Sequence, residues 1–268
     1  MDKTEVSIII PAHNEAPSIG KVVFDIRALY PDFEIIVIDD GSLDGTGEVA
    51  SDAGAMVYKH AYNIGNGAAI KSGIRIASGQ VMVFMDADGQ HDPEDLKKLI
   101  GHIPEFDMVV GARPKGEQAS WVRALGNRIY NRLASYVSKF AIQDLTSGFR
   151  AIKSDIAHNL IYLLPNTYSY PTTLTLGVLR TGRSVKYVPV KSQARKKGKS
   201  EVKIVRDGVR FFMIITKICA LYAPLRIFLP ISFVMFCLGL GHYLYTFLTA
   251  FYLHHRQYTL IISIICRK

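Results

Sequence analysis

The sequence predicts an α/β fold built on a mostly parallel sheet that is covered by helices. Three short apolar runs that contain β-branched residues, Val6–Ile10, Phe33–Ile38 and Val81–Met85, have the composition of strands buried on both faces. Segments with helical features separate them, as in doubly wound sheets. Carboxylates directly follow the second and third runs, and ligands in such folds bind beyond the carboxyl ends of the strands. The sequence therefore predicts a nucleotide site at that edge of the sheet.

The first strand, Val6–Ile10, is expected to end at Pro11. The loop Pro11–Glu15 then leads into a helix that runs from about Pro17 to Leu29. This strand, loop and helix form the first half of a βαβ unit, which places the loop at the predicted ligand-binding edge.

The second strand ends at Asp39 and Asp40, which are followed by Gly41 and Ser42. Either carboxylate could accept hydrogen bonds from a nucleotide base or ribose. Asp44 has a simpler explanation, because aspartate is a favoured cap for a helix such as the one expected at Gly45–Ala53. That capping role leaves Asp39 and Asp40 unexplained.

A third strand is expected at Ala55–Lys59, and a glycine-rich segment, Tyr62–Lys71, follows it. The glycines permit a tight turn whose amides, at a helix N-terminus, could face a phosphate. The spacing to Lys71 is not that of a P-loop. An ordinary turn explains this segment equally well.

The apolar run Val81–Met85 ends at Asp86 and Asp88, which project to the same side because side chains alternate along a strand. Two hard oxygen ligands at this spacing suit Mg²⁺ or Mn²⁺, and Gln90 adds a neutral oxygen. Two unpaired carboxylates this close repel each other unless a cation joins them. The sequence therefore predicts a metal site at Asp86, Asp88 and Gln90, followed by a helix capped by Asp92.

The composition indicates a membrane-associated protein. The stretch from Ile227 to Leu253 carries no charge other than that of a protonated His242, and about 20 apolar residues suffice to cross a bilayer. The chain has a formal net charge of +9, and basic residues crowd the segment between Lys186 and Arg226. This pattern favours anionic lipid as a partner and the cytoplasmic side for the residues before the span. No nucleic-acid-binding motif accompanies the basic patch, so nucleic acid is not expected as a partner.

Four segments carry a family resemblance in their order and spacing. The segments Pro11–Glu15, Asp39–Ser42, Asn63–Ala69 and Asp86–Asp88 resemble family 2 glycosyltransferases of the Rossmann-like GT-A fold. The likeness is closer to dolichyl-phosphate mannose synthase and to bacterial enzymes that glycosylate undecaprenyl phosphate, and it extends to about residue 230.

The resemblance implies roles for individual residues. Asp86, Asp88 and Gln90 correspond to a motif that binds the metal bridging the donor diphosphate. Pro11, Glu15 and Asp40 line the nucleotide pocket of the family.

The resemblance also covers the second half of the catalytic domain. A strand at Asp107–Val110 leads to Arg113, which together with Arg128 matches arginines that hold the acceptor phosphate. The segment Gln143–Arg150, which contains Asp144, is similar to a motif beside the active site.

A basic loop, Arg195–Ser200, is similar to one that closes over the donor in the family. The likeness is incomplete, because Glu201 stands where lysine is frequent and the next base is Lys203. As a charge run, this segment is also suited to the membrane surface. The following helix-like segment, with Arg206 and Arg210 on one side, is expected to lie in the headgroup region.

These observations predict a catalytic domain at residues 1–203, a juxtamembrane amphipathic helix at 204–226, a transmembrane helix at 227–253 and a short tail at 254–268 that could be part of a second span. The expected reaction is inverting transfer of a sugar from a UDP- or GDP-sugar to a polyprenyl phosphate. We assign Asp88, Arg113, Arg128 and Asp144 to catalysis, with Asp144 as an orienting or base residue. The expected donor contacts are Pro11, Glu15, Asp39, Asp40, Asp86 and Arg195.

Other functions remain open at this point. A family 2 glycosyltransferase with a saccharide or another lipid as acceptor would share the same donor motifs. A processive polysaccharide synthase would carry a Gln-x-x-Arg-Trp motif and several spans, which this sequence does not show. An inactive nucleotide-binding membrane regulator would not need the intact acidic and basic motif residues. The identity of the sugar and homo-oligomerisation are left open.

Overall fold

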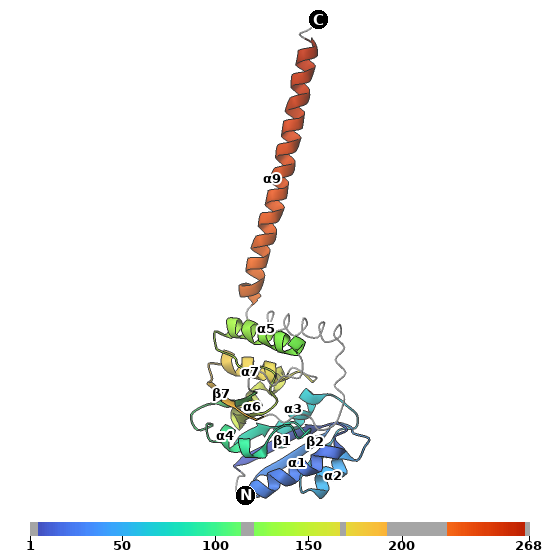
Figure 1. Ribbon diagram of the computed structural model, residues 1–268, viewed down its shortest axis with the longest axis vertical. Helices are drawn as coiled ribbons and strands as arrows, with labels where there is room; N and C mark the ends of the chain where they lie inside the picture. The colour runs from blue at the N-terminus through green and yellow to red at the C-terminus, as the bar shows by residue number, and fades with distance from the viewer. Residues whose placement is uncertain (1–4, 114–120, 167–169, 192–223, 266–268) are drawn as a thin grey trace. The chain divides into compact units, whose positions relative to one another are not determined.

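The computed structural model describes residues 5–113, 121–166, 170–191 and 224–265. The chain divides into two compact units, Met1–Ile218 and Cys219–Lys268. The first unit is a sheet with helices around it (Figure 1). The sheet has seven strands in the order β3-β2-β1-β4-β6-β5-β7. Neighbouring strands run parallel except at β6, which is antiparallel to both β4 and β5. The predicted mostly parallel α/β fold is therefore confirmed.

The strands are β1 (Val6–Ala12), β2 (Glu34–Asp39), β3 (Met56–Lys59), β4 (Val81–Phe84), β5 (Met108–Ala112), β6 (Arg150–Lys153) and β7 (Val185–Pro189). The α-helices of this unit are α1 (Ala16–Leu29), α2 (Thr46–Asp52), α3 (Asn66–Ile76), α4 (Leu96–Ile100), α5 (Trp121–Ser138), α6 (Ser154–Leu160) and α7 (Tyr170–Arg180). Two short 3₁₀ helices, η1 (Pro93–Asp95) and η2 (Ile161–Leu163), adjoin α4 and α6.

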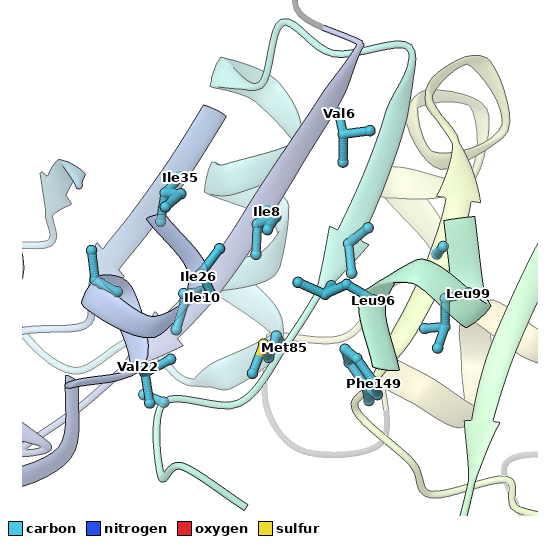
Figure 2. Close-up of a cluster of buried hydrophobic side chains, with 14 of the residues drawn as sticks. Val6, Ile8, Ile10, Val22, Ile26, Ile35, Met85, Leu96, Leu99 and Phe149 are labelled. Atoms are coloured by element: carbon cyan, nitrogen blue, oxygen red, sulfur yellow. The ribbon is translucent and has the colours of Figure 1, made fainter. Parts of the chain in front are cut away.

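Side chains of the central strands alternate between two hydrophobic layers. On one face, Ile8 and Ile10 of β1 pack in the same buried cluster as Val22 and Ile26 of α1 and Leu96 of α4 (Figure 2). On the other face, Ile9 of β1 and Phe84 of β4 share a buried cluster with residues of α3, α6 and α7. The strands are thus covered on both faces, which explains their nearly continuous apolar sequences.

One predicted boundary was wrong, because β1 continues through Pro11 to Ala12. Pro11 lies opposite Ile38 of β2 in the parallel ladder. On its other side, the pairing of β1 with β4 ends at Ile9 and Phe84. The backbone nitrogen of Pro11 therefore points beyond the end of that ladder, where the absence of an N–H group breaks no strand pairing.

The second unit contains the helix α9 (Pro224–Ile265) of 42 residues. Within it, the segment Phe228–Tyr252 is long and apolar enough to cross a membrane. The helix continues without interruption past residue 253, where the sequence suggested a short tail. The predicted amphipathic segment lies almost wholly outside the described residues.

Candidate active site

A pocket of about 540 Å³ lies at the carboxyl ends of β1, β2 and β4. Its walls include Pro11–His13, Glu15, Asp40, Asn63–Asn66, Ala69 and Asp86–Asp88. The fold therefore brings five of the predicted site residues, Pro11, Glu15, Asp40, Asp86 and Asp88, to one cavity. Sequence reasoning did not single out His13 or Asn66, although both lie in loops that follow strands, and loop position was the available signal.

Asp86 and Asp88 both line the pocket, but they do so from a turn, because β4 ends at Phe84. Ala87 between them is 4% exposed and belongs to the hydrophobic core. The Asp88 carboxylate accepts a hydrogen bond of 3.1 Å from the backbone N–H of Gln90. Gly89, with φ of 72°, supplies the left-handed turn between them.

The donor set of this pair fits a hard divalent cation. Asp86 and Asp88 provide carboxylate oxygens, and Gln90 adds an amide oxygen close in sequence but outside the pocket walls. Within the described residues, no group of three His, Cys, Asp or Glu side chains is arranged to hold a metal. A cation held by only two carboxylates keeps positions for water and for substrate phosphates, as Mg²⁺ commonly does.

Two neighbours hold the Asp86 carboxylate in place. The imidazole Nε2 of His91 lies 3.5 Å from Asp86 Oδ2, and the His91 ring stacks on Phe149 at 4.7 Å between centroids. Burial by itself raises the pKa of Asp86, but His91 and nearby arginines outweigh this effect and lower the pKa. Asp86 is therefore ionised at neutral pH, as a metal ligand must be.

Gly148 forms the second neighbour of Asp86. A Cβ atom at Gly148 would lie only 2.7 Å from Asp86 Oδ2. This close approach explains why glycine occupies this position in the segment Gln143–Arg150, because a side chain here would collide with the Asp86 carboxylate.

We expect Gly148→Ala to weaken divalent-cation binding by roughly tenfold, the equivalent of about 1.4 kcal/mol, since the added methyl group must move Asp86 or its own loop. Titration with Mn²⁺ followed by electron paramagnetic resonance measures this affinity. Gly177→Ala is the matched control, because a Cβ atom there meets its nearest neighbour at an ordinary 3.5 Å. Equal Mn²⁺ affinity in both variants would contradict the proposed contact.

Arg113 follows β5 and forms a two-pronged ion pair with Asp144. Its Nε donates to Asp144 Oδ2 at 2.8 Å, and its Nη2 donates to Asp144 Oδ1 at 3.1 Å and to Thr146 Oγ1 at 2.8 Å. Burial raises the pKa of Asp144, but the charge of Arg113 and the Thr146 hydrogen bonds outweigh it and lower the pKa. A carboxylate in this state is a weak base, so the geometry favours the orienting role for Asp144 over the base role.

Arg150, at the start of β6, is a buried cation. The sequence placed it in the segment Gln143–Arg150 but indicated no role for it individually. It is 0% exposed, and its guanidinium donates to the carbonyl of Pro171 at 2.7 Å, to Thr175 Oγ1 at 3.0 Å and to the carbonyl of Ser147. Burial lowers its pKa, and the surrounding acids and tyrosines oppose this effect. Arg150 thereby ties the loop that contains Gly148 to the start of α7.

The two carboxylates after β2 differ from the expectation that both offer free acceptors to a nucleotide. Asp39 is buried and does not line the pocket, and its Oδ1 accepts from the Ser42 N–H at 2.8 Å. Asp40 does line the pocket, but its oxygens accept from His60 and from the N–H groups of Ile64 and Gly65. The amides that could have faced a phosphate at this turn are thus directed to the Asp40 carboxylate.

Asp44 lies one residue before Gly45, which is the N-cap of α2, and its carboxylate makes different bonds from those of the predicted cap. Its Oδ1 accepts from the N–H of Thr46 at the start of α2, and its Oδ2 accepts from the N–H of Ala16 at the start of α1. One side chain therefore joins two helix N-termini at the edge of the pocket.

The remaining predicted residues that the structure describes, Arg113 and Asp144 among them, do not line the pocket. Arg128 is an exposed residue on α5 and does not line the cavity. Arg195 and the basic loop around it lie outside the described residues.

The doubly wound sheet, the acidic pair after β4 and the arginine held by Asp144 together define a glycosyltransferase of the GT-A fold. The model of glycosyl transferase family 2 matches residues 7–161, and that of the GtrB C-terminal hairpin matches residues 223–266. The chain belongs to glycosyl transferase family 2.

Two relatives with assigned activities are similar in sequence. An undecaprenyl-phosphate mannosyltransferase from Micrococcus luteus is 30% identical over 74% of this chain and 87% of its own length. A polyprenol monophosphomannose synthase from Mycolicibacterium smegmatis is 29% identical over 73% of this chain and 80% of its own.

The fold similarity extends to solved structures. Glucosyl-3-phosphoglycerate synthase from Mycobacterium tuberculosis, crystallised with Mn²⁺ and uridine diphosphate, superposes with a TM-score of 0.64 and 20% sequence identity. The match covers 81% of this chain and 79% of that one.

Proposed function

We propose that the protein transfers a sugar, with inversion, from a UDP- or GDP-sugar to the phosphate of a membrane polyprenol. The observation that carries this proposal is that the segment holding Arg113 packs against the acidic pair: Asp144 pairs with Arg113, and Gly148 of the same segment closely approaches the Asp86 carboxylate. Arg113 is close enough to Asp86 to lower that residue's pKa, while Asp144 and Thr146 fix its guanidinium. A pocket with two metal-binding carboxylates at one wall and a clamped guanidinium nearby suits a reaction between two phosphate-bearing substrates.

Asp86 and Asp88, with Gln90, would hold Mg²⁺ or Mn²⁺, and the bound ion supplies stabilisation for the negative charge of the departing nucleoside diphosphate. Pro11, Glu15 and Asp40 line the pocket that would take the donor. The attacking lipid phosphate is already an anion at neutral pH, so a strong general base is not required. This agrees with the ion-paired state of Asp144.

Arg113 is the better supported acceptor ligand of the two proposed arginines. Its guanidinium is held in a fixed orientation by two side chains, which reduces the entropy lost on binding a phosphate. Arg128 is exposed, which leaves it accessible to a lipid headgroup.

The membrane arrangement is part of the same proposal. The apolar segment Phe228–Tyr252 supports a membrane span, and the basic residues before it support contact with anionic lipid and a cytoplasmic catalytic domain. We propose the division into a catalytic domain at residues 1–203, a surface helix at 204–226, a span at 227–253 and a tail at 254–268. The two mannose-transferring relatives use polyprenyl phosphates by name, which supports the same acceptor class here.

The full-length protein in detergent should transfer radiolabelled sugar to undecaprenyl or dolichyl phosphate when it is given Mn²⁺ and the correct donor from a panel of UDP- and GDP-sugars. The product should extract into chloroform and should disappear when EDTA is added. Release of free sugar into the aqueous phase as the only product would contradict transfer to the lipid. Absence of transfer with every donor, despite metal-dependent nucleotide binding, would overturn the proposed acceptor.

A further inference from the structure

His60, directly after β3, connects Asp40 to α3 through two hydrogen bonds. It is 7% exposed. Its Nδ1 lies 2.7 Å from Asp40 Oδ1, and its Nε2 lies 2.9 Å from Ser72 Oγ. Because an ionised carboxylate only accepts hydrogen bonds, Nδ1 is the donor to Asp40, and in the neutral ring Nε2 accepts from the Ser72 hydroxyl.

The Asp40 carboxylate also accepts hydrogen bonds from two backbone amides in the wall of the pocket. Asp40 Oδ1 accepts from the Ile64 N–H at 2.9 Å, and Oδ2 accepts from the Gly65 N–H at 2.8 Å. Both Ile64 and Gly65 line the pocket. A continuous path of hydrogen bonds therefore runs from Ser72 through His60 and Asp40 to the backbone that a ligand would touch.

The backbone around this hydrogen-bond path leaves little room for another conformation of the loop. Gly41 has a φ of +71°, and a Cβ atom there would lie 2.5 Å from the carbonyl carbon of Tyr62. Gly65 also has a positive φ, of 121°. The loop is thus pressed against the segment that follows β2, and its position depends on how the Asp40 carboxylate is oriented.

We propose that His60 is a positioning residue for nucleotide binding, an inference that rests on the proposed function. By fixing Asp40 Oδ1, His60 sets the angle at which both carboxylate oxygens meet the amides of Ile64 and Gly65. The wall of the pocket is thereby formed before any ligand arrives. His60 acts through Asp40 and does not itself line the cavity.

The order Asp40, His60, Ser72 resembles the triad of a serine hydrolase, but the surroundings argue against a nucleophile. Ser72 lies in the middle of α3 and does not line the pocket. The path therefore serves to orient the loop.

Two substitutions distinguish the roles of the two ring nitrogens of His60. In His60→Asn the amide nitrogen can take the place of Nδ1 and keep the bond to Asp40, whereas in His60→Gln it reaches the position of Nε2 and the bond to Asp40 is lost. Hydrogen–deuterium exchange of peptides covering residues 61–67 reports the Ile64 and Gly65 amides directly. We expect exchange roughly tenfold faster or more in His60→Gln and near the wild-type rate in His60→Asn, as for loss of one hydrogen bond to a charged group.

Binding of UDP and of GDP, each with Mn²⁺, gives the second readout by calorimetry. His60→Gln should raise the dissociation constant of the nucleotide that binds by roughly tenfold, and His60→Asn should restore it. His158→Gln is the matched control, because His158 is exposed on α6 and, among the described residues, its hydrogen bonds stay within its own helix, with the Ser154 carbonyl at 2.9 Å. Thermal unfolding of each variant confirms that the fold is retained, and Ser72→Ala tests the other end of the path if His60→Gln does not fold.

Equal exchange and equal affinity in His60→Asn and His60→Gln would overturn the positioning role. Faster exchange in His60→Gln with unchanged nucleotide affinity would overturn its link to binding. If the wild-type protein binds neither nucleotide, the proposed function fails, whereas exchange at Ile64 and Gly65 still decides whether His60 orients the loop.

Discussion

Asp88→Asn should lower the kcat/KM of sugar transfer by roughly a thousandfold, because a metal ion at the leaving diphosphate contributes several kcal/mol to the transition state. Asparagine keeps the shape of the side chain and its hydrogen bond from the Gln90 N–H, but it removes the charge that holds the cation. Transfer at saturating Mn²⁺ and Mn²⁺ affinity by paramagnetic resonance should fall together.

The control is Asp92→Asn, which changes an acid from the same loop. Asp92 caps η1 by accepting from the Glu94 N–H at 3.0 Å, and it does not line the pocket. Asparagine caps about as well as aspartate, so this variant should remain near wild-type activity. Asp88→Asn with more than a tenth of wild-type activity at normal Mn²⁺ affinity would rule out the metal role.

Arg113→Met should reduce kcat/KM for the lipid acceptor by roughly a hundredfold or more, because it removes a phosphate-binding group and leaves the Asp144 carboxylate without its ion-pair partner. Arg113→Lys should recover little of this loss, since an ammonium group cannot reach both Asp144 and Thr146 in the fork geometry of a guanidinium. Arg132→Met, on the exposed face of α5, is the control and should stay within about twofold, as surface changes usually do. An unchanged acceptor KM and kcat in Arg113→Met would refute the assignment.

The same ion pair predicts a pH dependence of stability. The pKa of Asp144 is lowered in the folded protein, so the pair stabilises the fold above the unfolded-state pKa of about 3.9 and loses this contribution as the pH falls through the folded-state pKa. The difference in melting temperature between the wild-type protein and Asp144→Asn should therefore narrow on acidification. A difference that stays constant from neutral pH to below pH 3 would show that the pair contributes nothing through its charge.

The first half of the sheet could be predicted because its strands are apolar runs with clear ends. Val81–Met85 and Phe33–Ile38 owe their sequences to burial on both faces, and that requirement is local. Strand β6 escaped prediction because it has four residues and begins with Arg150, a charged residue that local patterns assign to the surface. Its position depends on antiparallel pairing with β4 and β5, which are distant in sequence.

The candidate site was likewise predictable only where the signal is local in sequence. Asp86 and Asp88 line one cavity as predicted, although the strand ends at Phe84 and a turn rather than strand alternation places them there. The state of Asp40 could not be predicted, because its partners Ile64 and Gly65 lie more than twenty residues away and their amides reach it only through the geometry of an intervening turn. A sequence shows that a carboxylate is present, but not whether the ligand or the protein's own backbone will use it.

The position of β6 between β4 and β5 also bears on how the protein folds during synthesis. Strands β4 and β5 are adjacent in the chain order, yet each pairs with β6, which is made later. A nascent chain that has just produced Asp86 therefore lacks the glycine that confines it, and the metal-binding wall is completed only after residues 148–153 have emerged and entered the sheet. Such pairings between distant segments slow folding, because the loop-closure entropy is lost before the contacts form. The wall that carries Asp86 thus cannot be completed by the strands that precede it in the chain.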